Sequence, residues 1–168
     1  NSSIDDPNPV LFFEHKALYR KLSGIVPDKL YHIEIGKAEI VKTGDALTII
    51  SYGLAVHWAI EVTEKMDDSG KRIEIIDLRT LIPWDKELIR SSVQKTGRVL
   101  ILHEDHKTGG FGAEISAWIS EHCFEYLDAP IKRVASKDIP IAYSSVLEDQ
   151  ILVQTDWILD TINEVVQY

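Results

Sequence analysis

The sequence predicts an α/β fold, namely a three-layer α/β/α sandwich built on a mostly parallel five-stranded sheet with one antiparallel edge strand. Short apolar segments of strand length alternate along the chain with segments whose apolar residues recur at helical spacing. Because short connections between such segments favour right-handed crossovers, the strands are expected to run parallel beneath helices on both faces. The 168 residues, 45% of them hydrophobic, can bury a core without disulfides or a structural metal.

The N-terminal part of the chain differs from the rest. Val10–Phe13 is a short aromatic run of strand character without an obvious partner strand, and residues 16–20 have helical composition. Glycine and proline residues interrupt every period between positions 23 and 36, which indicates a connector. We therefore divide the chain into residues 1–35 and a regular domain at residues 36–168.

The regular domain begins with a strand at residues 38–41. A turn at Thr43–Asp45 joins this strand to the next. We expect the strand at residues 38–41 to pair antiparallel at one edge of the sheet. Buried strands are predicted at residues 47–51, 73–77, 99–102 and 131–135. Helices are predicted at residues 54–66, 85–97, 111–127 and 155–166. Asp85 and Gly97 are the expected N-cap and stop of the second helix, and Thr155 or Asp156 is expected to cap the last.

Composition and charge exclude several classes of protein. The chain has 27 acidic and 18 basic residues, a formal charge of -9 and no stripe of Lys and Arg, so nucleic acid is not an expected partner. No apolar run approaches the roughly 18 residues that a membrane-spanning helix needs, so no membrane contact is expected. The single cysteine, Cys123, excludes a disulfide scaffold and is assigned to the core.

The N-terminus has neither an initiator methionine nor the basic and apolar regions of a signal peptide. We therefore expect the sequence to begin at a cut within a longer protein. A bacterial cytoplasm is the expected location.

The segment His103–Glu114 is the richest in chemistry, because it leads from a buried strand through glycines into a helix. Glycines permit close backbone approach, and free amides at a helix start favour an anion. The glycine spacing matches neither the dinucleotide fingerprint nor a phosphate loop, and Glu114 would occupy the positive end of the helix. A tight strand-to-helix connection is favoured. A free-standing nucleotide- or phosphate-binding module that uses Gly109–Gly112 stays open as an alternative.

His103 and His106 stand with Glu104 and Asp105 in an order that could suggest a metal site. Alternate side chains of an extended segment point in different directions, so these four are expected to be solvated and not to converge on an ion. No serine stands in a nucleophile elbow, and Cys123 lacks the setting of a nucleophile. We therefore assign no catalytic, cofactor-binding or metal-ligating residue.

Arg79 is unusual because it follows directly on a buried strand and precedes a largely apolar loop. A buried or interfacial arginine normally needs a carboxylate partner. The two interpretations are a structural ion pair, with Asp77 or Asp85, and a subunit contact.

Several segments, in order along nearly the whole chain, resemble one family: Pro9–Arg20, Gly36–Val41, Ile76–Asp85, Thr108–Ile115 and Leu127–Val134. The family is the beta subunit of the thiamine-diphosphate-dependent 2-oxoacid dehydrogenases, and the likeness falls on its C-terminal, transketolase-type domain. The Phe-Phe-Glu and Thr-Gly-Gly-Phe segments are similar to the branched-chain type, although His15 stands where that subgroup often has proline.

The resemblance implies that thiamine diphosphate and Mg²⁺ are held elsewhere in the parent enzyme, by the alpha part and by the preceding domain of the beta part. Val10–Glu14 would then be the last strand of that preceding, pyrimidine-binding domain. The parent decarboxylates a 2-oxoacid and passes the acyl group to a lipoyl arm, whereas this part alone is expected to be inactive. The tail of a transketolase or of a deoxyxylulose-phosphate synthase is the alternative within the same fold.

The resemblance also implies partners, namely the alpha part and the second beta part of the enzyme, with a homodimer as a further possibility. Another partner would be the small basic binding module of the dihydrolipoyl acyltransferase component, which a charge of -9 suits. Asp128 and the terminal Tyr168 are the candidate contacts with that module. The full set of candidate interface residues is Asp128, Tyr168, Arg79, Gly109, Gly110 and Phe111.

Overall fold

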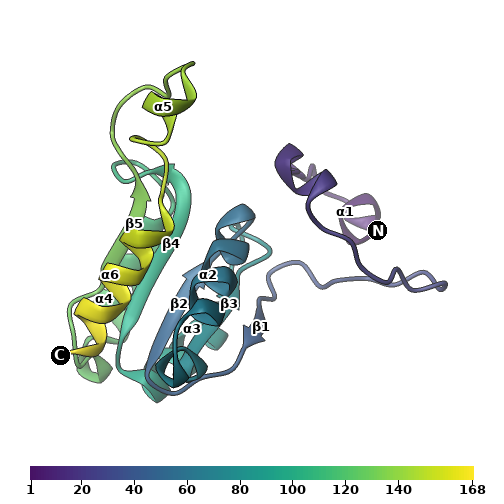
Figure 1. The fold of residues 1–168 in the computed structure, drawn as a ribbon. Coiled ribbons are helices and arrows are strands. Elements are labelled where there is room, and N and C mark those ends of the chain that lie inside the picture. Colours follow the sequence, from purple (N-terminus) through teal and green to yellow (C-terminus); the bar gives the residue numbers. More distant parts are fainter.

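The computed structural model describes all residues from Asn1 to Tyr168 and contains a five-stranded sheet of order β1-β3-β2-β4-β5 (Figure 1). Four strands run parallel, namely β2 (Leu47–Ser51), β3 (Ile73–Asp77), β4 (Val99–His106) and β5 (Lys132–Ser136). The edge strand β1 (Glu39–Lys42) pairs antiparallel with β3. The predicted fold class is therefore confirmed.

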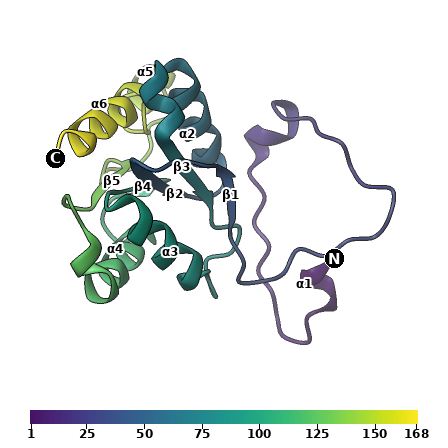
Figure 2. The ribbon, with the colours of Figure 1, turned by 90° about the horizontal axis from the view of Figure 1, so that it is seen from below.

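Helices cover both faces of this sheet and complete three layers (Figure 2). The helices α2 (Leu54–Lys65) and α6 (Thr155–Val166) lie on one face, and α3 (Lys86–Thr96) and α4 (Gly112–His122) lie on the other. Alternate residues of a strand point to opposite faces, so each strand contributes to both cores. On β2, Leu47 and Ile49 belong to the core under α2 and α6, whereas Ile50 belongs to the core under α3 and α4.

The ends of α3 follow from local chemistry. The side chain of Asp85 accepts a hydrogen bond of 3.1 Å from the Leu88 N–H, and Gly97 ends the helix in the left-handed region with φ 64°. Both predicted boundaries of this helix are confirmed. The predicted cap of α6 is wrong, because Thr155 and Asp156 are already helical and Gln154 precedes them without a side-chain cap.

The partner predicted for the edge strand is also wrong. The turn after β1 suggested a hairpin with β2, but β3 lies between these two strands. The connection crosses the start of β3, where the amides of Asp45 and Ala46 both donate to the Arg72 carbonyl at 2.9 Å. Gly44 permits this crossing, because a side chain there would overlap the backbone of residues 72–74.

Three other predicted elements have different limits. Val10–Phe13 is not a strand, because no neighbouring strand supplies the hydrogen bonds that it needs. The helix predicted at residues 111–127 ends at His122, where the backbone of Cys123 leaves the helical region, and a short 3₁₀ helix, η3 (Phe124–Tyr126), follows. The strand predicted at residues 99–102 extends to His106. Cys123 is buried in the core, as predicted.

Residues 1–35 form an arm beside the domain (Figures 1 and 2). The arm contains α1 (Ser2–Asp5) and the 3₁₀ helix η1 (Lys16–Arg20), and no residue before Leu47 is buried. Its large apolar side chains are at least 73% exposed at Leu11, Phe12, Phe13, Ile25, Val26 and Leu30. The Nε2 atom of His15 lies 2.9 Å from a carboxylate oxygen of Glu104 and links the arm to the end of β4.

The remaining short elements are η2 (Asp68–Arg72), which follows α2, and α5 (Ser145–Glu148), which precedes α6. None of the helices has the length and apolar character that crossing a membrane would require.

Candidate functional site

The carboxyl ends of β2, β3 and β4 meet at one edge of the sheet, which we call the carboxyl edge. In the strand register Ser51 and Asp77, the last residues of β2 and β3, lie level with Leu102, and β4 continues four residues further to His106. Ligands of open parallel sheets bind at this edge. By strand alternation Ser51 and Asp77 point toward the face of α2, whereas His103 points toward the face of α4.

His103 has no exposed surface, so the prediction that it is solvated is wrong. It continues the stripe of Val99 and Ile101, two core residues beneath α4, and this period of two was the sequence signal for its burial. Neither ring nitrogen has a hydrogen-bond partner. Burial lowers the pKa of His103, and the charge of Arg133 acts in the same direction, against the opposing effect of Asp105. The imidazole is therefore held in its neutral form.

The start of α4 lies directly against the His103 ring. A Cβ atom added to Gly110 would come within 2.7 Å of the ring carbon Cε1, and one added to Gly112 would overlap Nε2 and Cδ2. On another side, the ring of Tyr52 lies parallel to the imidazole with a centroid distance of 6.0 Å. Burial, together with the charge of Asp105, raises the pKa of Tyr52 to about 12, so the phenol is also neutral.

The turn Thr108–Phe111 connects β4 to α4 and folds over the imidazole. Gly109 has φ 79°, a conformation that favours glycine, and the amides of Gly110, Phe111 and Gly112 donate no backbone hydrogen bond. These amides form the positive end of α4. Since Gly110 and Gly112 pack against the His103 ring, the turn encloses a side chain.

A small hollow of about 330 Å³ lies beside this turn, lined by His106, Thr108, Asp138, Ile139 and Pro140. The carboxylate of Asp138 accepts hydrogen bonds from the backbone N–H and the hydroxyl of Thr108, at 2.8 and 2.7 Å. These bonds lower the pKa of Asp138. Nε2 of His106 lies 3.0 Å from the Ile139 carbonyl, and this contact raises the pKa of His106. These hydrogen bonds join the turn and the end of β4 to the segment after β5. His106 lines the hollow, whereas His103 is buried in the core.

Arg79 lies at the same edge but pairs differently from the prediction. Its guanidinium forms an ion pair with Glu39 on β1, so the predicted partners Asp77 and Asp85 are wrong. The Arg79 N–H donates to Oδ1 of Asp77 at 3.0 Å, and this turn gives Arg79 a φ of 56°. Burial raises the pKa of Asp77, although the hydrogen bond from Arg79 and the charge of His57 act against the increase.

The remaining candidate residues lie at the opposite end of the strands from the carboxyl edge, where the parallel strands begin. Asp128 precedes β5, its side chain is 65% exposed, and its N–H donates to the Gly97 carbonyl at 2.7 Å. Tyr168 follows α6, which runs back from the carboxyl edge, and the C-terminus lies at the opposite end of the domain from α5 (Figure 1). The structure thus places Arg79 and the turn Thr108–Phe111 at the carboxyl edge, and Asp128 and Tyr168 at the opposite end of the strands.

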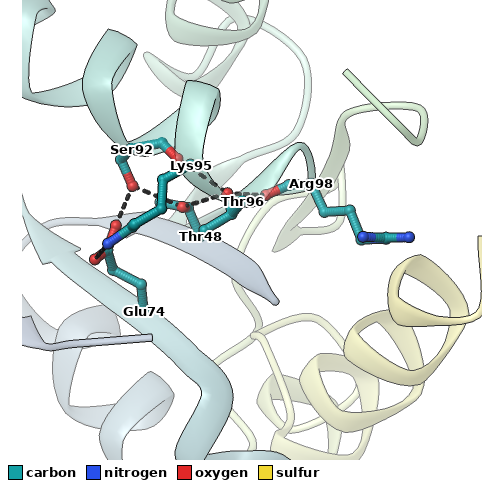
Figure 3. Close-up of polar contacts among 6 residues, drawn as sticks. All are labelled: Thr48, Glu74, Ser92, Lys95, Thr96 and Arg98. Carbon is teal, nitrogen blue, oxygen red and sulfur yellow. Dashed lines mark hydrogen bonds and ion pairs between the residues drawn. The ribbon is translucent and has the colours of Figure 1, made fainter. Parts of the chain in front are cut away.

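A second buried polar group, which we call the Glu74 cluster, lies between β2, β3 and α3 (Figure 3). The carboxylate of Glu74 is fully buried and accepts hydrogen bonds from the Ser92 hydroxyl and the Lys95 ammonium. The Thr48 hydroxyl lies 2.7 Å from that of Ser92 and 2.8 Å from that of Thr96. All the polar side-chain atoms of this cluster are paired, so it fixes α3 on the sheet and offers no free group for chemistry.

A profile of the family described as "Transketolase, C-terminal domain" matches residues 36–158. The chain belongs to the transketolase C-terminal domain family. A solved split-gene transketolase, described as an inactive beta4 tetramer, has the same fold, with a TM-score of 0.69 at 22% identity over 85% of this chain and 45% of that one. His103 and the turn Thr108–Phe111 lie within the residues that this family profile matches.

Among curated relatives of this domain are beta subunits of 2-oxoacid dehydrogenases. The 2-oxoisovalerate dehydrogenase subunit beta of Bacillus subtilis is 43% identical over 99% of this chain and 51% of its own length. The mitochondrial 2-oxoisovalerate dehydrogenase subunit beta 2 of Arabidopsis thaliana is 45% identical over 99% of this chain and 46% of its own length. The pyruvate dehydrogenase E1 component subunit beta of Cyanidium caldarium is 39% identical over 99% of this chain and 51% of its own length. The chain thus spans about half the length of these relatives.

The residues of this transketolase C-terminal domain do not fit the diphosphate of thiamine diphosphate or its Mg²⁺. Mg²⁺ takes oxygen ligands in octahedral geometry. No group of three or more His, Cys, Asp and Glu side chains is arranged to hold a metal ion. On the side of His103 the start of α4 has no room for an anion, because Gly110 and Gly112 pack against the buried imidazole.

Proposed function

We propose that this chain is the C-terminal part of a 2-oxoacid dehydrogenase beta subunit and that it assembles the enzyme and docks the acyltransferase component. The observation that carries the proposal is the identity of 43% and 45% to two 2-oxoisovalerate dehydrogenase beta subunits over 99% of the chain. A branched-chain 2-oxoacid is accordingly the proposed substrate class of the parent. A transketolase or deoxyxylulose-phosphate synthase tail is disfavoured, because the sequence relatives are dehydrogenase subunits.

The parent enzyme would decarboxylate its 2-oxoacid with thiamine diphosphate and Mg²⁺ and transfer the acyl group to a lipoyl arm. The poor fit of both cofactors to these residues supports the assignment of that chemistry to other parts of the enzyme. This chain would then be non-catalytic by itself. A bacterial cytoplasm is the proposed location, and the bacterial relative is consistent with it.

Residues 1–35 would be the end of the preceding domain and its linker. Their exposed apolar side chains, of which Phe13 is 88% exposed, support this proposal, because such a set normally packs against protein. The contact of 2.9 Å between Nε2 of His15 and a carboxylate oxygen of Glu104 would hold the arm against the domain.

The two ends of the strands would have different partners. At the carboxyl edge, Arg79, Gly109, Gly110 and Phe111 are the proposed contacts with the alpha part and the second beta part. At the opposite end of the strands, Asp128 and Tyr168 are the proposed contacts with the basic binding module of the acyltransferase. The charge of -9 would steer that module by long-range attraction.

A binding experiment tests the docking proposal. The chain is titrated with the binding module of a branched-chain acyltransferase at low and high salt, and we expect a complex that high salt weakens. Asp128→Asn should weaken the complex about fivefold, as expected for loss of roughly 1 kcal/mol. The matched control is Asp68→Asn, which removes the same charge from a carboxylate that is 93% exposed on η2. No complex at low salt, or equal losses in both variants, would contradict the proposed contact.

Calorimetry tests the proposed division of labour. Thiamine diphosphate with Mg²⁺ should give no saturable heat with this chain. A dissociation constant in the micromolar range would place a cofactor site within these residues and overturn the proposal.

A further inference from the structure

We propose that His103 is a pH-sensitive latch: its neutral imidazole holds the turn Thr108–Phe111 and the start of α4 in place, and its protonation releases them. The His103 ring is fully buried and makes no hydrogen bond through either nitrogen. A buried polar side chain without partners is rare and calls for a reason. Packing alone does not give one, because an apolar side chain would fill this place without the desolvation that an imidazole requires.

The contacts of the ring explain why the turn depends on it. Gly110 and Gly112 approach the imidazole so closely that neither position accepts a Cβ atom without displacement. Through these contacts the ring determines how closely the turn approaches β4. From the other side, the turn is held by the two hydrogen bonds between Thr108 and Asp138. Movement of the ring therefore must move the turn or the first residues of α4.

A proton on His103 would be poorly accommodated. An imidazolium donates from both nitrogens, and neither nitrogen has an acceptor. The ring lies against Gly110 and Gly112 at the N-terminus of α4, which is the positive end of the helix, so a second positive charge there is unfavourable.

The charged and titratable groups around the ring come from several elements. Tyr52, from the connection between β2 and α2, carries no charge in this pH range, and burial raises its pKa further, to about 12. Arg133 on β5 disfavours an imidazolium, whereas Asp105 on β4 favours one. Glu114 lies in the first turn of α4 and is exposed, and Glu104 is engaged by His15. Burial outweighs Asp105, so the pKa of His103 is lowered.

Acidification would therefore convert a well-packed neutral ring into an unpaired buried cation. We expect the ring to leave its site toward water and the turn to open with it. Gly109, Gly110 and Phe111 are proposed subunit contacts, so a weaker subunit contact at low pH is a consequence that rests on the proposed function. The latch itself does not depend on that function.

Nuclear magnetic resonance of the whole 168-residue chain tests the latch without any partner. Ring signals of the six histidines and the amide signals of Gly109–Gly112 are followed from about pH 7.5 downward past the ordinary histidine pKa of about 6.5. We expect His103 to stay neutral at the midpoint of an ordinary histidine and then to titrate at lower pH. The amides of the turn should change with the same midpoint and lose protection from solvent exchange, corrected for intrinsic rates.

Two variants assign the effect. His103→Gln cannot titrate, so the turn amides should become insensitive to pH over this range. His122→Gln removes an exposed histidine at the other end of α4 and should leave the turn titration unchanged. A His103 midpoint at or above its ordinary value, turn amides that ignore its protonation, or an unchanged turn titration in His103→Gln would each overturn the latch. The wild-type titration decides the question by itself if His103→Gln does not fold.

Discussion

The Glu74 cluster and the His103 site lie on the same face of one sheet, yet their buried polar atoms are in opposite states. Glu74 sits early in β3, and both of its carboxylate oxygens receive hydrogen bonds, one of them from a cation (Figure 3). His103 sits at the carboxyl edge, and both of its nitrogens lack a partner. A fully paired group gains nothing from moving, whereas an unpaired one gains hydrogen bonds with water when it leaves. The Glu74 cluster is therefore structural, whereas the His103 site can respond to a change of pH.

The largest effect is expected from breaking the Glu74 cluster. Lys95→Met leaves a fully buried carboxylate without its counter-charge and should lower the free energy of unfolding by about 3 kcal/mol, since breaking one side of a buried ion pair is strongly destabilising. Urea denaturation measures the loss. The double variant Glu74→Met with Lys95→Met should recover most of it, because the charge is then removed with its partner.

A control for that experiment uses an exposed pair. Lys71→Met breaks an ion pair with Asp68 in which both side chains are at least 80% exposed, and it should cost less than about 0.5 kcal/mol. Similar losses for Lys95→Met and Lys71→Met would show that Glu74 is less buried, or less dependent on its lysine, than the comparison requires.

The next effect comes from filling the space against the His103 ring. Gly112→Ala should destabilise the chain by about 2 kcal/mol through overpacking, even though alanine is otherwise the better helix former. The three atoms nearest to the added Cβ would be two atoms of the His103 ring and, at 3.1 Å, a methyl group of Ile101. His103→Ala should therefore relieve much of the loss, with a coupling energy of at least about 1 kcal/mol in a double-mutant cycle.

Gly110→Ala is the matched control for this rescue. A Cβ at Gly110 would meet the backbone carbonyl of His106 as well as the imidazole. Removing the ring cannot move that carbonyl, so His103→Ala should not rescue Gly110→Ala. Rescue of both glycine variants, or of neither, would mean that the ring does not set the position of α4 as described.

These contacts also show what the sequence could and could not predict. The alternation of apolar strands and helical stripes was sufficient for the parallel sheet, and the Asp85 cap and Gly97 stop follow from short-range chemistry alone. The order of the strands is a long-range property, so the turn after β1 suggested the wrong neighbour. The burial of His103 was present in the pattern as the next member of the Val99–Ile101 stripe, but a polar residue at the end of an apolar run was interpreted as the start of a loop.

A smaller effect is expected from pH. The pKa of His103 is lowered in the folded chain, so the unfolded state binds more protons once the pH falls below the unfolded pKa of about 6.5. Stability due to neutral His103 is thus complete above that pH and decreases as the pH falls, with a limiting slope of about 1.4 kcal/mol per unit for one proton. The raised pKa of His106 acts in the opposite direction, because it stabilises the folded chain as the pH falls. The measurement is therefore the difference between wild type and His103→Gln between about pH 7 and about pH 5. If the stability of wild type and of His103→Gln changed equally with pH, burial of neutral His103 would not contribute to the pH dependence.

The smallest effect on stability is expected at Asp128, and it completes the comparison with Glu74. Both residues are carboxylates near a cation, but the side chain of Asp128 is 65% exposed and lies 3.7 Å from Arg98, whereas Glu74 is fully buried. A solvated carboxylate keeps its hydration in either state, so Asp128→Asn should change the free energy of unfolding by less than about 0.5 kcal/mol. Urea denaturation measures this change, and its result is compared with that for Glu74→Gln, which removes the same charge at the buried site and should cost more. Any weakening of acyltransferase docking by Asp128→Asn would then reflect the contact itself, because the fold is intact. A large loss of stability in Asp128→Asn would instead make this residue part of the fold and withdraw it as a docking contact.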